Sequence, residues 1–466
     1  MTAPITAILI GAGNRGARVY GEYGLLQPSD IEFVGVAEPD DARRARFSTG
    51  HDVNPEFQCA SWSELLAKPK LADAAVICTQ DQKHIEPTLA ALRAGYDVLL
   101  ENPMATTAAD CILLVNEAER LGRTLQICHV LRYAPFFTRL YHIINSGRLG
   151  DVITIEHREN VSWWHMAHSY VRGSWSRLNE SAPMILSKCC HDLDILVWVM
   201  RQSVARLSSF GSLTHYAPAR APAGATPRCT DDCAAADDCI FYAPRHYAPA
   251  RAPSAHPANK AGFGEHPFML HALDGGNTPD SRWRTLQTSP YGRCVYGACN
   301  DVVDHQVIVM EFERGATCTF TVHGHSDREG RTLRIDGSRA TLHGDFAYAP
   351  YPQFFTIHDH GCDHEERIDI DPGESGHGGG DQGVIRDFVA GLRGRPSAVS
   401  SSKCNELMVV NLRCANGTCG GAWVGVVQAL AGCGESCGLP MRPYKNSAIP
   451  ARWAGQSLPK LSKRSL

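Results

Sequence analysis

Short apolar runs alternate with amphipathic stretches along the first 128 residues. The runs at 5–10, 31–37 and 74–79 have the composition of buried strands. Between them, apolar residues recur at the spacing of a helix. Another strand is predicted near 96–101. A repeated strand–helix order is typical of a parallel sheet with helices on both faces. We therefore predict that residues 1–128 form an α/β domain with a doubly wound parallel sheet of the Rossmann type.

The hydrophobic pattern changes after residue 129. A helix is expected after Tyr133 and a long one within 182–200, and the stretches DHQVIVMEF and ATCTFTVHG alternate as antiparallel strands do. We predict that residues 129–400 form an α+β domain with a mostly antiparallel open sheet. This domain would bind substrate and mediate oligomerisation.

Residues 215–280 interrupt this second domain with a segment rich in Pro, Ala and Cys. The octapeptide HYAPARAP occurs at 215–222 and again at 246–253, and its prolines predict an extended, polyproline-like loop. Three cysteines lie between the copies. They either bind zinc with a fourth ligand or remain unpaired thiols, and their spacing matches no common zinc finger. The residues concerned are Cys229, Cys233 and Cys239, with His246, Cys294 or Cys299 as the fourth ligand.

Residues 401–466 form an atypical tail rich in Gly and Cys. An amphipathic helix packed against the first domain would be expected there, but the sequence offers only a poor version of one. We assign no function to this tail.

A glycine turn, GAGNRG, follows the first predicted strand and precedes a helix. In a dinucleotide fold, Gly11 makes the tight turn, Gly13 lets the backbone approach a pyrophosphate, and Gly16 lets the helix pack on the strand. The free N–H groups of the helix N-terminus would face the pyrophosphate. The turn therefore predicts a dinucleotide-binding site.

The second strand ends on Glu38, where a carboxylate can accept hydrogen bonds from a ribose diol. Arg43 and Arg44 follow and would reach a 2′-phosphate, but Glu38 would repel it. We therefore predict NAD as the cofactor and keep NADP as the alternative.

Composition narrows the possible partners and compartment. The 466 residues carry a net charge of −4 with acids and bases interspersed, so neither nucleic acid nor a membrane is expected as a partner. No targeting segment is recognisable, so the 18 cysteines are expected to be reduced thiols in the cytoplasm.

Four segments together are similar to the Gfo/Idh/MocA family, the glucose-fructose oxidoreductase and inositol dehydrogenase type. They are GAGNRG, VICTQDQKH, VLLENPMA and CCHDLDIL. The resemblance implies an NAD(P)-dependent oxidoreductase that acts by hydride transfer on a secondary hydroxyl of a sugar, sugar acid or cyclitol. It also implies a homo-oligomer. The cofactor-binding residues would be Gly11, Gly13, Asn14, Arg15, Gly16, Glu38, Thr79, Gln80, His84, Glu101 and Asn102.

The catalytic residues depart from the family pattern. The family has lysine where this chain has Asn102, and asparagine cannot titrate. Lys188, three residues before His191, would replace that lysine if one helix placed both on the same face. His191 stands at the family's histidine position and would take the proton from the substrate hydroxyl. Ser187 occupies the place of the family's aspartate.

The segment VSWWHMAHSYVRGSWS at 161–176 has the aromatic and polar composition of a sugar-binding wall, or of a surface loop pinned by aromatics. The substrate contacts would be Arg132, Trp164, His165, His168, Tyr170, Arg172 and His191. Five residues near 300 either line the cleft or belong to the framework: Arg293, Tyr296, Asn300, Asp304 and His305. His377 and Asp381 flank a glycine loop that either approaches a ligand or enters a helix. We assign no metal to the catalytic site.

Two other functions stay open at this point. One is a redox-neutral, NAD-dependent glycoside hydrolase, for which His165 and His168 would transfer a proton to the leaving group. The other is a nucleotide-binding protein in which Asn102 marks weakened or lost catalysis.

Overall fold

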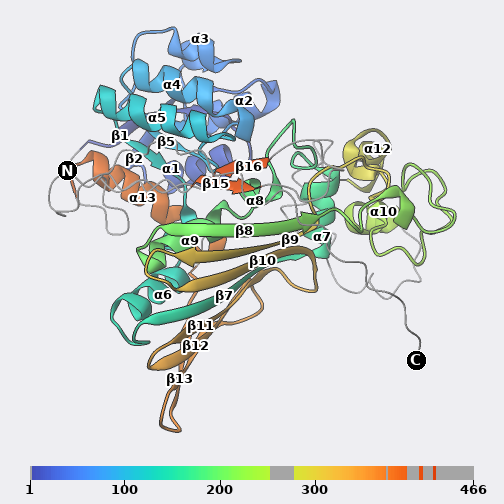
Figure 1. Ribbon diagram of the computed structural model, residues 1–466. Helices are drawn as coiled ribbons and strands as arrows, with labels where there is room; N and C mark the ends of the chain where they lie inside the picture. The colour runs from blue at the N-terminus through green and yellow to red at the C-terminus, as the bar shows by residue number, and fades with distance from the viewer. Residues whose placement is uncertain (1–2, 252–277, 374–375, 396–408, 413–422, 427–466) are drawn as a thin grey trace, which may run out of the picture.

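The computed structural model describes residues 3–251, 278–373, 376–395, 409–412 and 423–426, which form two large sheets with their helices and one separate pair of strands (Figure 1). The first sheet has six parallel strands in the order β3-β2-β1-β4-β5-β6. These strands are β1 (Ile5–Ile10), β2 (Ile31–Ala37), β3 (Gln58–Cys59), β4 (Ala74–Ile77), β5 (Asp97–Leu100) and β6 (Leu125–Ile127). The predicted doubly wound sheet is confirmed.

Helices cover both faces of this sheet, and each face has its own apolar core. One face packs against α3 (Trp62–Leu66), α4 (Ile85–Arg93) and α5 (Ala108–Leu121). The opposite face packs against the segment after the glycine turn and against two further helices. These elements are the π-helical turn Gly16–Gly21, α1 (Glu22–Leu26), α2 (Asp41–Gly50) and α13 (Gly380–Leu392).

The second sheet has eight strands in the order β14-β13-β12-β11-β7-β10-β9-β8. Only β7 and β10 pair in parallel, so the predicted mostly antiparallel sheet is also confirmed. The strands are β7 (Val152–Ser162), β8 (Val204–Ser212), β9 (His305–Phe312), β10 (Thr317–Ser326), β11 (Gly330–Gly337), β12 (Ala340–Ala347), β13 (Gln353–Asp359) and β14 (Glu365–Ile370). Their inner face shares one core with α6 (Pro135–Asn145) and α9 (Cys190–Met200).

The single helix predicted within 182–200 is wrong. α8 (Met184–Ser187) ends after four residues, and α9 begins only at Cys190. Cys189, at φ −96° and ψ 4°, lies outside the helical region. Lys188 and His191 therefore do not share one continuous helix face.

The prolines of the insertion produce turns instead of the predicted extended loop. Each HYAPARAP copy contains a 3-10 turn, at Pro218–Arg220 and at Pro249–Arg251. Proline has the φ that such a turn needs, and the alanine and arginine after it keep their N–H donors. The helix α10 (Ala243–Tyr247) precedes the second turn, and α12 (Pro279–Thr288) lies further along the chain. The rest of the predicted loop, 252–277, lies outside the described residues.

A C-terminal segment returns to the first domain, as expected, but it lies earlier in the chain than the tail. α13 places Val384, Ile385 and Phe388 in the core of the first sheet. Of the tail, the structure describes the antiparallel pair β15 (Val409–Leu412) and β16 (Trp423–Val426). Within the described residues, no helix has both the length and the apolar character needed to cross a membrane.

Candidate functional site

The glycine turn between β1 and the first helix has little space for side chains at two of its glycines. Gly11 has φ +95°, and a Cβ there would lie 2.5 Å from the carbonyl oxygen of Cys78. A Cβ on Gly16 would lie 2.0 Å from the carbonyl oxygen of Gly11. No atom lies within 4 Å of the corresponding position at Gly13. The turn is thus closed toward the protein and open at Gly13, as approach of a pyrophosphate requires.

Glu38 connects the end of β2 to this turn. Its buried carboxylate accepts hydrogen bonds from the backbone N–H of Ala12 at 2.7 Å and of Asp40 at 3.0 Å. A carboxylate has about four acceptor positions, so acceptor capacity remains for a ribose diol. Arg44 donates to the carbonyl oxygen of Glu38 at 2.6 Å. The glycine turn and the acid therefore fit an NAD-type dinucleotide.

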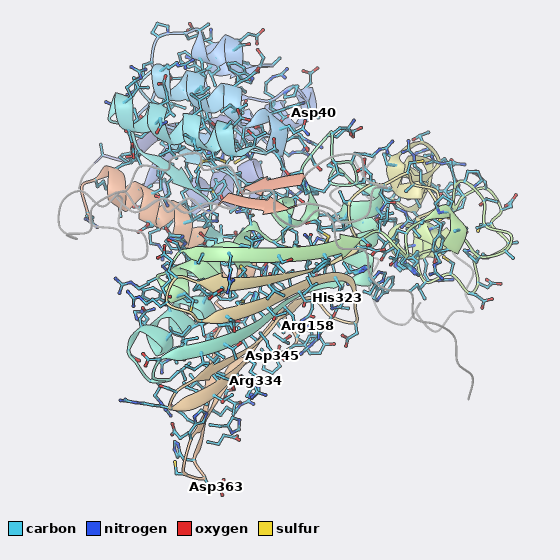
Figure 2. The ribbon with its side chains drawn as sticks, viewed as in Figure 1. Asp40, Arg158, His323, Arg334, Asp345 and Asp363 are labelled. Atoms are coloured by element: carbon cyan, nitrogen blue, oxygen red, sulfur yellow. The ribbon has the colours of Figure 1, made fainter. Side chains whose placement is uncertain are left out.

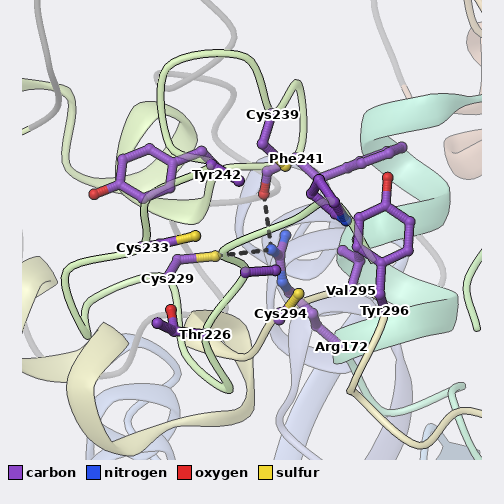
Figure 3. A pocket seen from close by; sticks show the side chains of 13 residues that line it. Arg172, Thr226, Cys229, Cys233, Cys239, Phe241, Tyr242, Cys294, Val295 and Tyr296 are labelled. Carbon is purple, nitrogen blue, oxygen red and sulfur yellow. Dashed lines mark hydrogen bonds between the residues drawn. The ribbon is translucent and has the colours of Figure 1, made fainter. Parts of the chain in front are cut away.

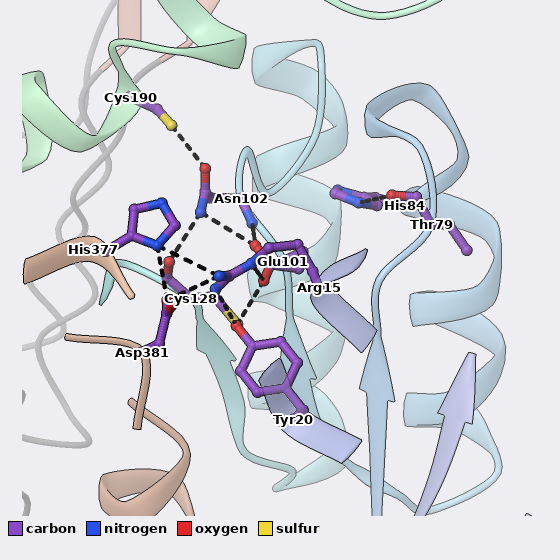
Figure 4. A network of polar contacts seen from close by, with 10 residues as sticks. All are labelled: Arg15, Tyr20, Thr79, His84, Glu101, Asn102, Cys128, Cys190, His377 and Asp381. Carbon is purple, nitrogen blue, oxygen red and sulfur yellow. Dashed lines mark hydrogen bonds and ion pairs between the residues drawn. The ribbon is translucent and has the colours of Figure 1, made fainter. Parts of the chain in front are cut away.

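Arg15, from the glycine turn, joins the two domains at the end of β5 (Figure 4). Its guanidinium donates to Glu101 at 2.6 Å and to Asp381 of α13 at 2.8 Å, and Tyr20 also donates to Glu101, at 2.6 Å. Burial alone would lower the pKa of Arg15, but Glu101, Tyr20 and Asp381 together raise it well above its usual value. Arg15 is therefore a permanent cation beside the strand tip.

Asn102 is held from both sides of the cleft. Its amide nitrogen donates to the carbonyl oxygen of Cys128 at 2.9 Å, and its amide oxygen accepts from the thiol of Cys190 at 3.1 Å. Because Cys190 is the first residue of α9, this contact connects the tip of β5 to the helix that carries His191. Asn102 is therefore a fixed hydrogen-bonding group between β5 and α9.

Thr79, Gln80 and His84, the predicted cofactor-binding residues after β4, lie in a short loop held by hydrogen bonds. The ring nitrogens of His84 lie 2.7 Å from the carbonyl oxygen of Pro103 and 3.0 Å from that of Thr79. Thr79 donates from its hydroxyl to Lys83 at 3.1 Å, while Gln80 is exposed. His84 therefore positions the loop from the inside, and contact of these three residues with a cofactor stays a prediction.

His191 has an unused nitrogen in the interior of the protein. Its Nδ1 is buried without a hydrogen-bond partner in the described structure. The His377 ring is 5.7 Å away between centroids. Burial, followed by the nearby charges of His377 and Arg331, lowers the pKa of His191 well below its usual value. At neutral pH His191 is therefore an uncharged imidazole, able to accept a proton.

The start of α9 is anchored by a buried ion cluster. Asp192 accepts two hydrogen bonds from Arg331, at 2.7 and 3.2 Å, and lies 2.7 Å from Nε2 of His157. Arg331 also pairs with Glu159 at 2.7 Å. Asp192 therefore orients the helix start but does not contact the neighbouring His191 ring.

We expect Arg331→Met to lower the free energy of unfolding by about 3–5 kcal/mol, because it leaves the buried carboxylates of Asp192 and Glu159 without their common cation. Urea unfolding followed by circular dichroism measures this loss. Arg334→Met is the matched control on the same strand, since Arg334 is half exposed and pairs with Asp336 at the surface. Equal stability of the two variants would contradict the anchoring role.

Lys188 pairs with two carboxylates. Its ammonium lies 3.1 Å from both Glu159 and Glu329, and Glu329 also lies 2.9 Å from Nδ1 of His165. Burial favours a lower pKa for Lys188, but the two carboxylates outweigh it and keep that pKa well above its usual value. Lys188 is thus a charged group held between two carboxylates, and a role as substitute catalytic lysine stays a prediction. Glu329 could not be predicted from the sequence. It directly precedes β11, and only the fold brings it to His165 of the aromatic segment.

Several predicted substrate contacts are engaged by protein groups. Arg132 makes two hydrogen bonds to Asp194, at 2.8 and 2.6 Å. His168 is buried with its Nδ1 2.6 Å from the Tyr247 hydroxyl, and Arg172 is buried against the insertion. Contact of these residues with a substrate stays a prediction.

The aromatic segment mostly packs inward. Tyr170 is buried in the core of the second domain, and Trp164 stacks on His165 at 5.6 Å between ring centroids. Near residue 300, Asp304 accepts from the backbone of Thr214 and His215, which is framework bonding. Of the other four residues predicted here, Tyr296 belongs to the core and His305 lies 2.7 Å from Asp304. For Arg293 and Asn300 a place in the site stays a prediction.

His377 and Asp381 lie beside Arg15 of the glycine turn. Nδ1 of His377 lies 2.9 Å from Asp381, which also pairs with Arg15. Asp381 does not cap its helix, because the N-cap of α13 is Gly379. His377 and Arg15 together hold the pKa of the Asp381 carboxyl below its usual value, against the effect of burial.

Comparisons with known proteins agree with this arrangement. A family described as an oxidoreductase family with an NAD-binding Rossmann fold matches residues 5–129, and its C-terminal alpha/beta domain matches residues 142–401. Together these matches span well over half of the chain. The chain belongs to the Gfo/Idh/MocA oxidoreductase family.

Curated relatives of this family member are distant. The putative oxidoreductase YteT of Bacillus subtilis (strain 168) is 22% identical over 356 residues, which is 72% of this chain and 76% of YteT. The 2,7-anhydro-N-acetylneuraminate hydratase of Escherichia coli (strain K12) is 24% identical over 172 residues, 36% of this chain and 45% of the hydratase. The aligned part is thus under half of the hydratase.

A solved structure with the same fold contains both cofactor and cyclitol. It is an inositol dehydrogenase homolog from Azotobacter vinelandii complexed with NADH and myo-inositol, with a TM-score of 0.54 at 16% identity. The superposition covers 84% of this chain and 88% of that one. At this identity the likeness shows the fold. The family match identifies the first domain as NAD-binding.

Proposed function

We propose that this protein is an NAD(P)-dependent oxidoreductase that oxidises a secondary hydroxyl of a sugar, sugar acid or cyclitol, with NAD favoured over NADP by Glu38. The observation that carries the proposal is the unpartnered, buried Nδ1 of His191. A buried polar atom without a partner costs free energy and points to a ligand that satisfies it. The lowered pKa of His191 keeps its imidazole uncharged at neutral pH, and an uncharged imidazole has one ring nitrogen that can accept a proton.

Each residue of the cleft has a distinct task in this proposal. Bound NAD supplies the hydride acceptor. Glu38 and the glycine turn hold the dinucleotide, and His191 takes the proton of the substrate hydroxyl. Asn102 donates or accepts a hydrogen bond near the reacting carbon without titrating. Arg15 positions the carboxylates of Glu101 and Asp381 beside the strand tip through its two ion pairs.

Reduction of NAD by a panel of sugars, sugar acids and cyclitols tests the proposal. The purified protein is incubated with each compound and with NAD or NADP, and NADH formation is followed by absorbance. Turnover with at least one class is expected, with NAD preferred. Tight binding of NAD without turnover of any compound would reject net dehydrogenase activity and leave only nucleotide binding.

A redox-neutral reaction is the second candidate, and the cluster of His165, Glu329 and Lys188 favours it. Glu329 lies 2.9 Å from Nδ1 of His165 and positions its imidazole, a group that can transfer a proton to a leaving group. Release of the aglycone from an aryl glycoside without net NADH formation would support a glycoside hydrolase of this kind. If no aryl glycoside turns over, the candidate is lost.

Asn102→Lys separates a working enzyme from a weakened one. If His191 is sufficient as the base, we expect kcat to change by less than about tenfold, or about 1.4 kcal/mol in activation free energy. Asn102→Met is the control, because it has similar length and adds no charge. A gain of about a hundredfold or more in the lysine variant alone would show that the natural chain is a catalytically weakened nucleotide-binding protein.

A homo-oligomer remains part of the proposal. The outer face of the second sheet has exposed apolar side chains on its β8–β9 side, with Phe210 61% and Val309 48% exposed. Elsewhere this face has charged and polar groups such as Arg158, Arg334 and Asp345 (Figure 2). Light scattering of the purified protein measures the subunit number, and a monomer at all concentrations would contradict the proposal.

A further inference from the structure

Four cysteines of the insertion lobe, defined here as residues 215–251 and 278–304, line one cavity. They are Cys229, Cys233, Cys239 and Cys294 (Figure 3). The cavity is about 10 Å³, which is room for a single water-sized sphere and too little for an organic ligand. All four thiols are free, so no disulfide accounts for their convergence.

A short backbone bridge brings the most distant of these cysteines together. Arg228 pairs with Arg293 in antiparallel fashion. The N–H of Cys229 donates to the carbonyl of Gly292 at 2.8 Å, and the N–H of Cys294 donates to that of Pro227 at 2.9 Å. Tertiary structure thus supplies the fourth thiol that the spacing of the first three left undefined.

The other two candidates for a fourth ligand are unsuited. Nε2 of His246 lies 2.7 Å from the carbonyl oxygen of Ile240, and His246 lines a different cavity. Cys299 is exposed, and its thiol lies 3.7 Å from the carbonyl oxygen of Gly297. Cys294 therefore completes the set.

A buried cation beside the thiols requires negative charge at this place. Arg172 is 4% exposed and donates to the carbonyl oxygens of Arg293 and Phe241, each at 2.8 Å. Its Nη2 also lies 3.6 Å from Sγ of Cys229, and within the described residues no carboxylate pairs with it. A buried charge is stable only when it is paired, and four metal-bound thiolates around a divalent ion carry a net negative charge that would pair with Arg172.

We propose that Cys229, Cys233, Cys239 and Cys294 form a structural zinc site that fastens the insertion lobe. The separate core of the lobe consists of six buried residues, while other lobe residues such as Tyr216 and Tyr296 belong to the core of the second domain. Small cores are often completed by a metal. In the described part of the chain no three Cys, His, Asp or Glu side chains yet surround one point at ligand distance. Binding therefore turns the thiols inward, and one change of staggered χ1 moves a sulfur by roughly 3 Å.

Metal content of the full-length protein tests the proposal. The protein is produced with zinc in the medium, purified under reducing conditions without chelator, and measured by elemental mass spectrometry. We expect about one zinc ion per chain, as a single four-thiolate site predicts. Cys294→Ser should bind zinc at least about tenfold more weakly, because one of four ligands is lost. Cys299→Ser, the matched control outside the cavity, should keep its zinc.

Cobalt substitution keeps the test independent of variants that fail to fold. The wild-type protein, stripped by a chelator and reloaded with Co²⁺, should show the visible bands of a tetrahedral thiolate site. These bands should disappear when Zn²⁺ is added. Absence of bound metal after incubation with Zn²⁺, an iron content instead of zinc, or pairs of disulfides detected by mass would each overturn the proposal.

Discussion

Replacing His191 with glutamine should lower kcat by about 10²- to 10⁴-fold, the usual contribution of a general base. Glutamine keeps a hydrogen-bonding group in the cleft but cannot accept a proton. Affinity for NAD should be unchanged, because the contacts of Glu38 and the glycine turn do not involve His191. Steady-state kinetics on whichever substrate the panel identifies, with NAD binding measured by fluorescence, would separate the two effects.

The pH dependence of the oxidation rate tests the role of His191 as the base independently of the substitution. A base must be unprotonated to act, and the pKa of His191 lies well below 6.5. Oxidation should therefore stay level as the pH falls through 6.5 and decline only at more acidic pH. A decline centred near 6.5 would point to an ordinary exposed histidine. His165→Gln is the control, since loss of activity in that variant alone would favour the redox-neutral candidate.

Gly16→Ala should abolish NAD binding and lower the stability of the first domain. The new methyl group would lie 2.0 Å from the carbonyl oxygen of Gly11 and 3.1 Å from Leu9, and a backbone oxygen cannot move aside as a flexible side chain can. Overpacking of a filled site costs about 1–3 kcal/mol, and here the turn that faces the pyrophosphate has to shift as well. Thermal unfolding and NAD titration together measure the effect.

Gly13→Ala is the matched control for Gly16→Ala. No atom lies within 4 Å of the position where its methyl group would stand, so the variant should fold as well as the natural protein. It should nevertheless bind NAD more weakly, because the methyl group occupies the space through which the pyrophosphate approaches. Normal NAD affinity in Gly13→Ala would contradict the predicted position of the dinucleotide.

The nucleotide half of the site could be predicted because its parts are close together in the chain. Gly11, Gly13 and Gly16 directly follow β1 and Glu38 directly follows β2, so local spacing places them. The substrate half could not be predicted in the same way. Arg15 contacts Asp381, 366 positions away, and His165 contacts Glu329, 164 positions away. No local sequence pattern predicts contacts between residues so far apart in the chain.

Sequence by itself determined the two sheets, the glycine turn and the family, because alternating hydrophobicity and glycine spacing act over a few residues. Tertiary structure alone decided the rest. The helix is broken at Cys189, and Lys188 before the break pairs with Glu159 and Glu329. A bridge between residues 228 and 293 adds the fourth thiol to the insertion lobe. In both cases the outcome depends on which distant charges and backbone groups the folded chain brings into contact, and burial makes those contacts obligatory.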